Sequence, residues 1–266
     1  DQDRLYAGRD RVSHPVPPGE GELEHRTVNR ITTLLANYSA TPDLYLSLSV
    51  PYVSRYHEHF DGGDFERFRL DGLGDIALSG RYRFLPDLSA SLAVKLPTGN
   101  RSSANDEGVE AEPTIAPGTG STDLSASLVW QRTANVPSLT WGPLGNTGAM
   151  PYFVGITGRR NGVGTRSYRV GDELQINAGA NYPVSQAFQA LLQVNARFKG
   201  KDDVGETDAV RDDTGGSFVY LSPGARLALS PKTALYGYVQ IPIYQRINGV
   251  NIASTYNLFT GLQVRL

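Results

Sequence analysis

Apolar residues recur at every second position over long stretches of the chain. From Leu44 to Tyr52 the even positions carry Leu, Leu, Leu, Val and Tyr, and the odd positions carry Tyr, Ser, Ser and Pro. The same period returns in residues 88–96, 174–182 and 256–266. A period of two is typical of β-strands with one apolar face, and no segment shows an apolar stripe of helical period over four turns. The pattern predicts an all-β chain.

The predicted strands are too long for an ordinary soluble domain. They number about twelve and cover residues 2–13, 23–39, 43–58, 71–85, 87–98, 120–134, 149–160, 170–182, 186–200, 215–229, 232–247 and 252–266. Strands in soluble domains average about 5 to 6 residues, whereas a strand that crosses the hydrocarbon core of a bilayer needs about 9 to 11.

The second face of these strands separates two architectures. In a soluble sandwich that face looks at water and carries many Lys and Glu residues, but here it carries Ser, Asn, Gln, Gly and scattered Arg. Tyrosines gather near strand ends, as in an aromatic girdle, at Tyr38, Tyr52, Tyr82, Tyr152 and Tyr182. We expect a transmembrane antiparallel β-barrel that forms a single domain over residues 1–266, with a soluble sandwich or barrel as the alternative.

The connections between strands predict the orientation of the barrel. Short turns fall at residues 40–43, 85–87, 183–185 and 230–232, and long polar connections at 59–70, 99–118, 160–170 and 200–214. Bacterial barrels keep short turns in the periplasm and have an even number of strands, so we expect both termini to be periplasmic. On this scheme residues 135–148 form a longer periplasmic turn, and 14–21 and 248–251 form outer loops.

Composition and charge exclude several classes of protein. The chain has 266 residues, a mass of 28.9 kDa and a formal net charge of −2 at pH 7. The near-neutral charge argues against a nucleic-acid partner, and the lack of Cys excludes a disulfide framework and thiolate metal sites. No stretch approaches the roughly 18 consecutive apolar residues of a transmembrane helix. The chain begins without a basic and apolar leader, so we expect Asp1 to start a processed chain.

Three short glycine-containing motifs lie where predicted strands meet long connections. They are Gly72-Leu73-Gly74-Asp75, Val94-Lys95-Leu96-Pro97-Thr98-Gly99 and Gly118-Thr119-Gly120-Ser121-Thr122-Asp123-Leu124. In this order they resemble the motifs of the outer-membrane β-barrel family named for the "MetA-pathway of phenol degradation". The resemblance rests on motifs over residues 43–130 and on strand pattern elsewhere, and the chain departs from the usual barrel ending because Leu266 replaces a terminal Phe. It implies a barrel that moves small, often hydrophobic or aromatic, compounds inward.

The residues of these motifs also have a structural interpretation. Gly72 and Gly74 permit backbone geometry that other residues avoid, and Pro97 ends a strand by removing a hydrogen-bond donor. Asp75 and Asp123 begin two strands near the outer rim, where each can accept hydrogen bonds from loop amides or pair with an arginine. We favour this structural role and keep direct ligand binding as the alternative.

If the apolar face meets lipid, the alternate residues point into the lumen. The expected lumen-lining residues are Arg55, Asp75, Arg81, Arg83, Lys95, Asp123, Glu173, Arg197, Arg226, Tyr236, Tyr238 and Arg246. One interpretation is that the basic residues pair with acids and brace the wall. The other is a passage that prefers anions or stacks flat aromatic solutes.

Catalytic and metal-binding features are weak. His57 and His59 form an H-x-H without an evident third ligand, so we expect surface histidines and no metal site. No serine has a G-x-S-x-G setting, and we expect neither an enzyme nor a cofactor. The acidic residues of 201–213 lack EF-hand spacing, so we expect a solvated loop, while Arg159 and Arg160 are placed to meet lipid phosphates.

Three prolines interrupt predicted strands, namely Pro51, Pro223 and Pro242. Each lacks a ladder donor and predicts a bulge or a local opening in the wall, with shaping of the barrel as the preferred role.

The sequence therefore favours an outer-membrane barrel for passive passage of small molecules. The expected partners are outer-membrane lipid and lipopolysaccharide, a small-molecule solute, and an unidentified protein. The alternative function is a non-conducting scaffold barrel that holds a periplasmic or surface partner.

Overall fold

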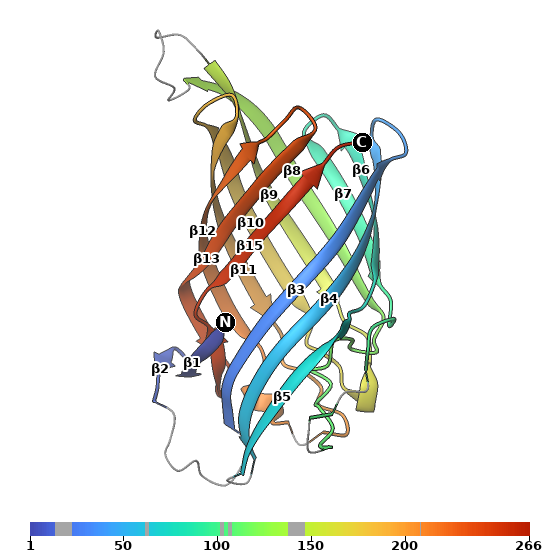
Figure 1. Cartoon of the computed structure of the whole chain (residues 1–266), viewed down its shortest axis with the longest axis vertical. Coiled ribbons are helices and arrows are strands. Elements are labelled where there is room, and N and C mark those ends of the chain that lie inside the picture. The colour runs from blue at the N-terminus through green and yellow to red at the C-terminus, as the bar shows by residue number, and fades with distance from the viewer. Residues whose placement is uncertain (14–22, 62–63, 102–103, 106–107, 138–146, 208) are drawn as a thin grey trace.

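The described residues form one curled antiparallel sheet of fifteen strands (Figure 1). The computed structural model covers residues 1–266 and describes all of them except 14–22, 62–63, 102–103, 106–107, 138–146 and 208. The strands are β1 (Gln2–Ala7), β2 (Asp10–Arg11), β3 (Leu23–Ser39), β4 (Leu44–Asp61), β5 (Asp64–Leu73), β6 (Ala77–Leu85), β7 (Leu88–Lys95), β8 (Asp123–Pro137), β9 (Thr147–Arg160), β10 (Glu173–Pro183), β11 (Phe188–Lys199), β12 (Gly216–Ala228), β13 (Thr233–Ile247), β14 (Val250–Ser254) and β15 (Asn257–Val264). Two single 3-10 turns, η1 (Thr165–Ser167) and η2 (Arg211–Asp213), lie in long connections. The prediction of an all-β antiparallel chain is confirmed.

Strands that follow one another in sequence lie side by side around the wall. The hydrogen-bonded path runs β14-β1-β3-β4-β6-β7-β8-β9-β10-β11-β12-β13-β15. β5 and β6 pair with successive halves of β4, so they form one passage of the wall with a break at residues 74–76. β14 and β15 also follow one another in the last passage, but β14 pairs with β1 and β15 pairs with β13. The long strands therefore follow the predicted succession.

The first predicted strand is wrong. Residues 2–13 were expected to cross the wall once, but β1 has six residues and turns back through β2. β1 pairs with β14 at the loop end of the barrel and reaches β3 only through Gln2 opposite Thr27. Asp1 lies well below the C-terminus in Figure 1, so the two described ends do not meet at the short-turn end. Charged residues and weak alternation in this segment explain the poor prediction.

The edges of β15 and β3 face each other in Figure 1, but no ladder joins them among the described strands. At the loop end Asp1, which precedes β1, is bonded to the residues between β14 and β15. Its terminal ammonium donates to Tyr256 O at 3.3 Å, and its carbonyl oxygen accepts from Thr255 N at 2.9 Å. The gap between β3 and β15 begins beyond these bonds. The N-terminal segment thus joins the first and last passages of the wall at the loop end alone.

Most predicted connections are found where they were expected. Short turns join β3 to β4, β6 to β7, β10 to β11 and β12 to β13, and all lie at one end of the barrel (Figure 1). The described residues of the long connections 99–118, 160–170 and 200–214 lie at the other end (Figure 1). The expected loop at 59–70 is wrong, because β4 and β5 continue as a ladder from Tyr52–Leu73 out to Asp61–Asp64. The predicted loop at 14–21 lies outside the described residues, as does most of the predicted turn at 135–148.

All three prolines sit at irregular positions in the ladders. Pro242 adjoins the register shift between β12 and β13, and Pro223 falls where that ladder skips between Leu221 and Gly224. Pro51 lies where β4 changes partner from β6 to β5, and its carbonyl accepts from Gly74 N at 2.9 Å. The predicted irregularities at the three prolines are therefore present in the ladders.

The two faces of the sheet differ in polarity. The outward face is apolar and open, with Leu34 72% exposed, Leu92 71% and Leu258 64%. Tyr38 and Tyr82 lie on that face near the short turns, and Tyr52 lies toward the loop end. None of the described residues forms a helix long and apolar enough to cross a membrane. The main buried apolar cluster, Phe68, Leu70, Ala111 and Ile115, lies at the loop end.

Candidate functional site

The three glycine-containing motifs meet at the loop end of the barrel. Gly99 and Gly118 approach so closely that a Cβ on Gly118 would lie 2.5 Å from the carbonyl carbon of Gly99. A Cβ on Gly74 would lie 3.3 Å from the carbonyl oxygen of Pro117. Only residues without a side chain allow this contact between backbones, which explains Gly74, Gly99 and Gly118.

Lys95 is the centre of the network that these motifs build, which we call the Lys95 network (Asp75, Lys95, Thr119, Ser121 and Asp123). Its Nζ lies 2.8 Å from Asp75 Oδ2 and 2.9 Å from Asp123 Oδ2. It also donates to Ser121 Oγ at 3.2 Å and to Thr119 Oγ1. One ammonium with two carboxylates and two hydroxyls leaves little capacity for a ligand, so the arrangement is structural.

Asp75 holds the loops through backbone amides as well. Gly99 N donates to its Oδ1 at 3.0 Å, and Thr119 N donates to its Oδ2 at 3.0 Å. Burial favours a higher pKa for this carboxyl, but the hydrogen bonds from Lys95, Thr119 and Gly99 outweigh it and lower the pKa below the ordinary 3.8. Asp75 lies between β5 and β6, outside the strands.

Asp123 extends the network to the next long connection. Its Oδ1 accepts from Ser121 Oγ at 2.8 Å and from Gly162 N at 3.0 Å. The structural role expected for both aspartates agrees with these contacts.

Arg55 fastens part of the 99–118 connection across the inner face of β4 and β5. Its Nη1 donates to Thr114 O at 2.8 Å and to Ala116 O at 3.5 Å, while Nε donates to Asn29 Oδ1 at 2.5 Å. Ile115 packs against Phe68 and Leu70 in the buried cluster. Residues 111–117 therefore lie inside the loop end of the barrel and narrow it.

A second polar network crosses the inner face farther round the wall. Arg197 Nη2 lies 2.6 Å from Glu173 Oε2, and Gln175 also donates to Glu173. Beyond them a run of amide and hydroxyl contacts links Asn177, Asn195, Ser222, Gln240 and Asn257. The inner face thus carries hydrogen-bonding groups across five neighbouring strands, β10 to β13 and β15.

Arginines and aromatic rings share the inner face toward the short turns. Arg81 Cζ lies 4.7 Å from the centre of the Tyr45 ring, and Arg83 Nη2 lies 2.7 Å from Asp43 Oδ1. In the β12–β13 ladder Arg226 faces Tyr236, and Tyr238 stacks on Phe259 with ring centres 4.7 Å apart. Phe259 was not among the expected lumen-lining residues, although strand alternation places it beside them.

Arg246 lies on the opposite face. The register shift in β13 pairs Arg246 with Ser217 and Gln245 with Phe218, so Gln245 takes the buried inner position and Arg246 is exposed. Strict alternation along β13 had placed Arg246 in the lumen. Ile243 is an extra residue without a partner in the β12–β13 ladder, and it exchanges the two faces for the residues that follow.

His57 and His59 are buried, which corrects the expectation of surface histidines. Their exposed fractions are 2% and 5%. His57 shares hydrogen bonds with Thr27 at 2.8 Å and with His59 at 2.9 Å, and Glu24 and Glu66 lie within 3.5 Å of the two rings. The pair continues the inward alternation of Val53 and Arg55, a signal that the sequence did contain. No group of three His, Cys, Asp or Glu suited to a metal ion occurs in the part of the chain that the structure describes.

One aspartate of the acidic segment 201–213 is buried, although a solvated loop was expected. Asp202 is only 2% exposed and accepts hydrogen bonds from Tyr168 Oη at 2.7 Å, Gly171 N at 2.7 Å and Lys199 Nζ at 3.0 Å. It joins two long connections, as Asp123 does. The alternating charges around Lys199 and Lys201 did not distinguish this buried aspartate from its exposed neighbours.

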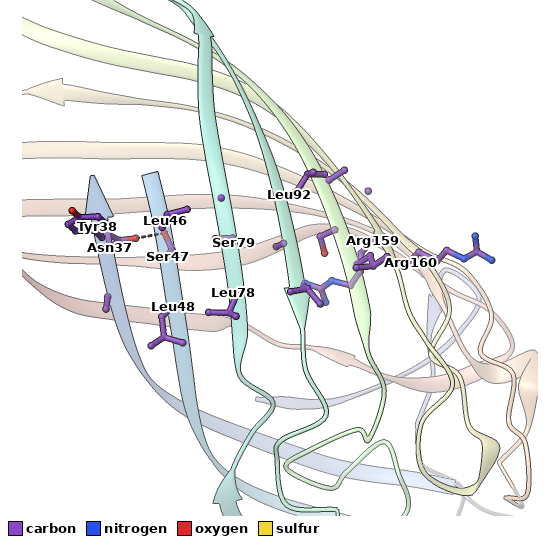
Figure 2. A pocket seen from close by; sticks show the side chains of 18 of the residues that line it. Asn37, Tyr38, Leu46, Ser47, Leu48, Leu78, Ser79, Leu92, Arg159 and Arg160 are labelled. Carbon is purple, nitrogen blue, oxygen red and sulfur yellow. Dashed lines mark hydrogen bonds between the residues drawn. The ribbon is translucent and has the colours of Figure 1, made fainter. Parts of the chain in front are cut away.

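A hollow with a volume of about 1130 Å³ crosses β3, β4, β6, β7, β8 and β9 (Figure 2). Two rows of outward residues border it, and they include Tyr38, Leu46, Leu48, Leu78, Leu92 and Leu124. Charged side chains occur in its lining only at Arg159, Arg160 and Glu173. A hollow with this lining suits apolar chains, in agreement with the exposed leucines around it.

One comparison with a solved structure agrees with the architecture. No family model matches the chain, and no curated protein matches it. The crystal structure of an outer membrane channel from Pseudomonas putida F1 superposes with a TM-score of 0.60 at 16% identity, covering 99% of this chain and 91% of that one. The beta domain of the Bordetella autotransporter BrkA gives a TM-score of 0.48 at 11% identity, with coverages of 99% and 97%. At 16% identity the first likeness concerns the fold, and this chain shares the fold of a solved outer membrane channel.

Proposed function

We propose that the protein is an outer-membrane barrel that lets small molecules pass through its lumen. The observation that carries this proposal is the separation of its two faces. Open leucines cover the outside, and hydrogen-bonding side chains run across the inside. Contact with lipid suits the apolar outer face, and a water-filled passage supplies hydrogen-bond partners to the polar inner face. The short turns would face the periplasm and the long connections the exterior.

The solute class follows from the inner face near the short turns. Arg226, Tyr236, Tyr238 and Phe259 offer a cation and aromatic rings within one region of the wall. Flat aromatic or weakly anionic solutes suit such groups through stacking and cation–π contacts. The resemblance of the three motifs to the phenol-degradation family points to the same class.

The alternative is a scaffold barrel that conducts nothing. Residues 111–117 narrow the loop end, and Arg55 holds them there. If this arrangement is permanent, the lumen serves only to brace the wall. We favour passage because Arg55 holds these residues mainly through backbone carbonyls, which a modest rearrangement can release.

Single-channel recording of the purified full chain in a planar bilayer with potassium chloride tests the proposal. Conductance steps are expected from the wild type, and Arg55→Ala is expected to raise the mean conductance about twofold or more by releasing residues 111–117. Arg211→Ala, an exposed arginine of η2, is the control. Silence from both the wild type and Arg55→Ala, with heat-modifiable folded protein, would favour the scaffold.

We propose no catalytic role. His57 and His59 are engaged with Thr27 and with each other at the loop end, where they pack on Phe68. Structural contacts account for these histidines without a substrate.

A further inference from the structure

Arginines gather on the outward face of β3 and β5 next to the loop end. Strand alternation and register place Arg26 and Arg30 of β3 on the same face as Tyr56 of β4 and Arg69 of β5. Val28 lies opposite Tyr56, and Tyr56 lies opposite Arg69, so the four charged and aromatic side chains surround one small area. This placement is unusual, because the same face is apolar along the rest of the strands toward the short turns.

The arginines border a hollow of about 350 Å³. Its lining consists of seven outward residues and of Arg55, whose side chain lies on the inner face. The outward residues are Arg26, Val28, Arg30, Ser54, Tyr56, Arg69 and Asp71. The Arg69 guanidinium carbon lies 5.9 Å from the centre of the Tyr56 ring, which holds this side chain over the hollow. A phosphate group has the size and the acceptor geometry that several guanidinium groups can hold at once.

Nearby acids leave part of this positive charge uncompensated. Arg26 forms a two-point contact with Asp1, at 3.2 and 3.1 Å, and Arg67 lies 3.5 Å from Glu58. Among the described residues no ion pair within 4.0 Å is found for Arg30, Arg69 or Asp71. Arg30 and Arg69 therefore share the hollow with one carboxylate, that of Asp71, and a bound anion would neutralise the remaining positive charge.

The surface next to the hollow suits acyl chains. Going down the strands from Arg30, Ser54 and Asp71, the next outward residues are Thr32, Tyr52 and Leu73, followed by Leu34 and Val50. Leu34 is 72% exposed, Leu73 55% and Tyr52 50%. A cationic hollow above an open apolar surface matches an amphiphile with a phosphate head and several acyl chains.

We propose that Arg30 and Arg69, with Arg26 and Tyr56 beside them, form a binding site for the phosphate of an outer-leaflet glycolipid of the lipid A class. The site lies on the outside of the barrel and is distinct from the lumen. This inference rests on the proposed outer-membrane location with the long connections outward, but it does not require that the lumen conducts.

Native mass spectrometry of the full chain in detergent tests the site with bis-phosphorylated lipid A as the probe. We expect the wild type to hold one lipid A, and Arg30→Gln with Arg69→Gln to weaken the apparent Kd about tenfold or more. Arg30→Lys with Arg69→Lys should restore part of the binding. The matched control is Arg132→Gln with Arg265→Gln, which removes two positive charges at the short-turn end. It should stay within about twofold of the wild type.

Two further arms identify the source of the phosphate. Lipid A stripped of both phosphates should bind about tenfold more weakly, and inorganic phosphate should displace bis-phosphorylated lipid A only in large excess. Equal binding of the stripped lipid, equal loss in the control variant, or displacement by equimolar inorganic phosphate would each overturn the proposal. Heat-modifiability of every variant shows that the barrel is folded, and bilayer conductance is recorded separately, so failure of this site leaves the proposed passage untouched.

Discussion

Gly99 and Gly118 lie back to back, with room for no Cβ on either residue. A Cβ on Gly99 would lie 2.8 Å from Gly118 Cα, and a Cβ on Gly118 would lie 2.7 Å from Gly99 Cα. The two ends of the connection 99–118 thus meet at a point where only hydrogen atoms separate the backbones.

We expect Gly118→Ala to destabilise the barrel by about 1–3 kcal/mol, because the added methyl group forces the two backbones apart. Unfolding by urea in detergent micelles measures the effect. Gly158→Ala is the matched control, since a Cβ there meets no atom within 4 Å. Equal losses for the two variants would show that the contact between Gly99 and Gly118 tolerates a side chain.

Removing the ammonium of Lys95 should be more severe. Lys95→Met leaves Asp75 and Asp123 buried and facing each other, and the loss of one partner of a buried ion pair costs about 3–5 kcal/mol. Lys232→Met removes an exposed lysine in the β12–β13 turn and should change little. A heat-modifiability midpoint that is unchanged in Lys95→Met would contradict the central role of Lys95.

Acid should loosen the same network through Asp75. Its folded pKa lies below the ordinary 3.8, so the ionised carboxylate contributes stability above that pH, and this stability is lost as the pH falls through the folded value. We expect Asp75→Asn to be less stable than the wild type at neutral pH and to lose less stability on acidification below about pH 4. The test is to measure the unfolding midpoints of the wild type and of Asp75→Asn from neutral pH to below about pH 4. Asp64→Asn, which changes an exposed aspartate, is the control. If Asp75→Asn loses as much stability on acidification as the wild type, groups other than Asp75 cause the loss.

Two arginines of β6 should differ in their effect on ion selectivity. Arg83 is neutralised by Asp43, whereas Arg81 lies over the Tyr45 ring with no carboxylate within 4.0 Å among the described residues. Arg81→Ala should therefore shift the reversal potential in a potassium chloride gradient away from anion preference, and Arg83→Ala should shift it much less. A larger shift from Arg83→Ala, or none from either variant in a conducting barrel, would remove Arg81 from the pathway.

Strand alternation predicted the wall well because each residue there has only two environments. Leu44 to Ser49, their partners in β6 and the facing residues of β7 follow the expected faces. The rule failed at Arg246, where one extra residue in β13 exchanges the two faces beyond it. His57 and His59 keep the inward face that alternation gives them, and they are buried because β5 continues beside β4 where a loop was expected.

The Lys95 network was only partly predictable. The three motifs were recognisable, and the aspartates were expected to hold loop amides, which they do. That Lys95 joins both of them depends on neighbouring strands bringing residues 75, 95 and 123 to one height, because Lys95 faces Asp123 across the β7–β8 ladder. The buried position of Asp202 could not be predicted, since it depends on how two irregular connections pack.

The pairing of β1 with β14 has a consequence for how the protein folds. Gln2 lies opposite Ser254, so this ladder joins residues that are about as far apart in the sequence as the chain permits. Contacts of such long range form slowly, because the intervening chain must be ordered before they contribute stability. The long hairpins β3–β4 and β8–β9 can form early, whereas β1 can pair only after β14 has reached its place in the sheet. We therefore expect the N-terminal segment to be the last part to gain protection from hydrogen exchange, and the first to lose it when residues 250–266 are removed.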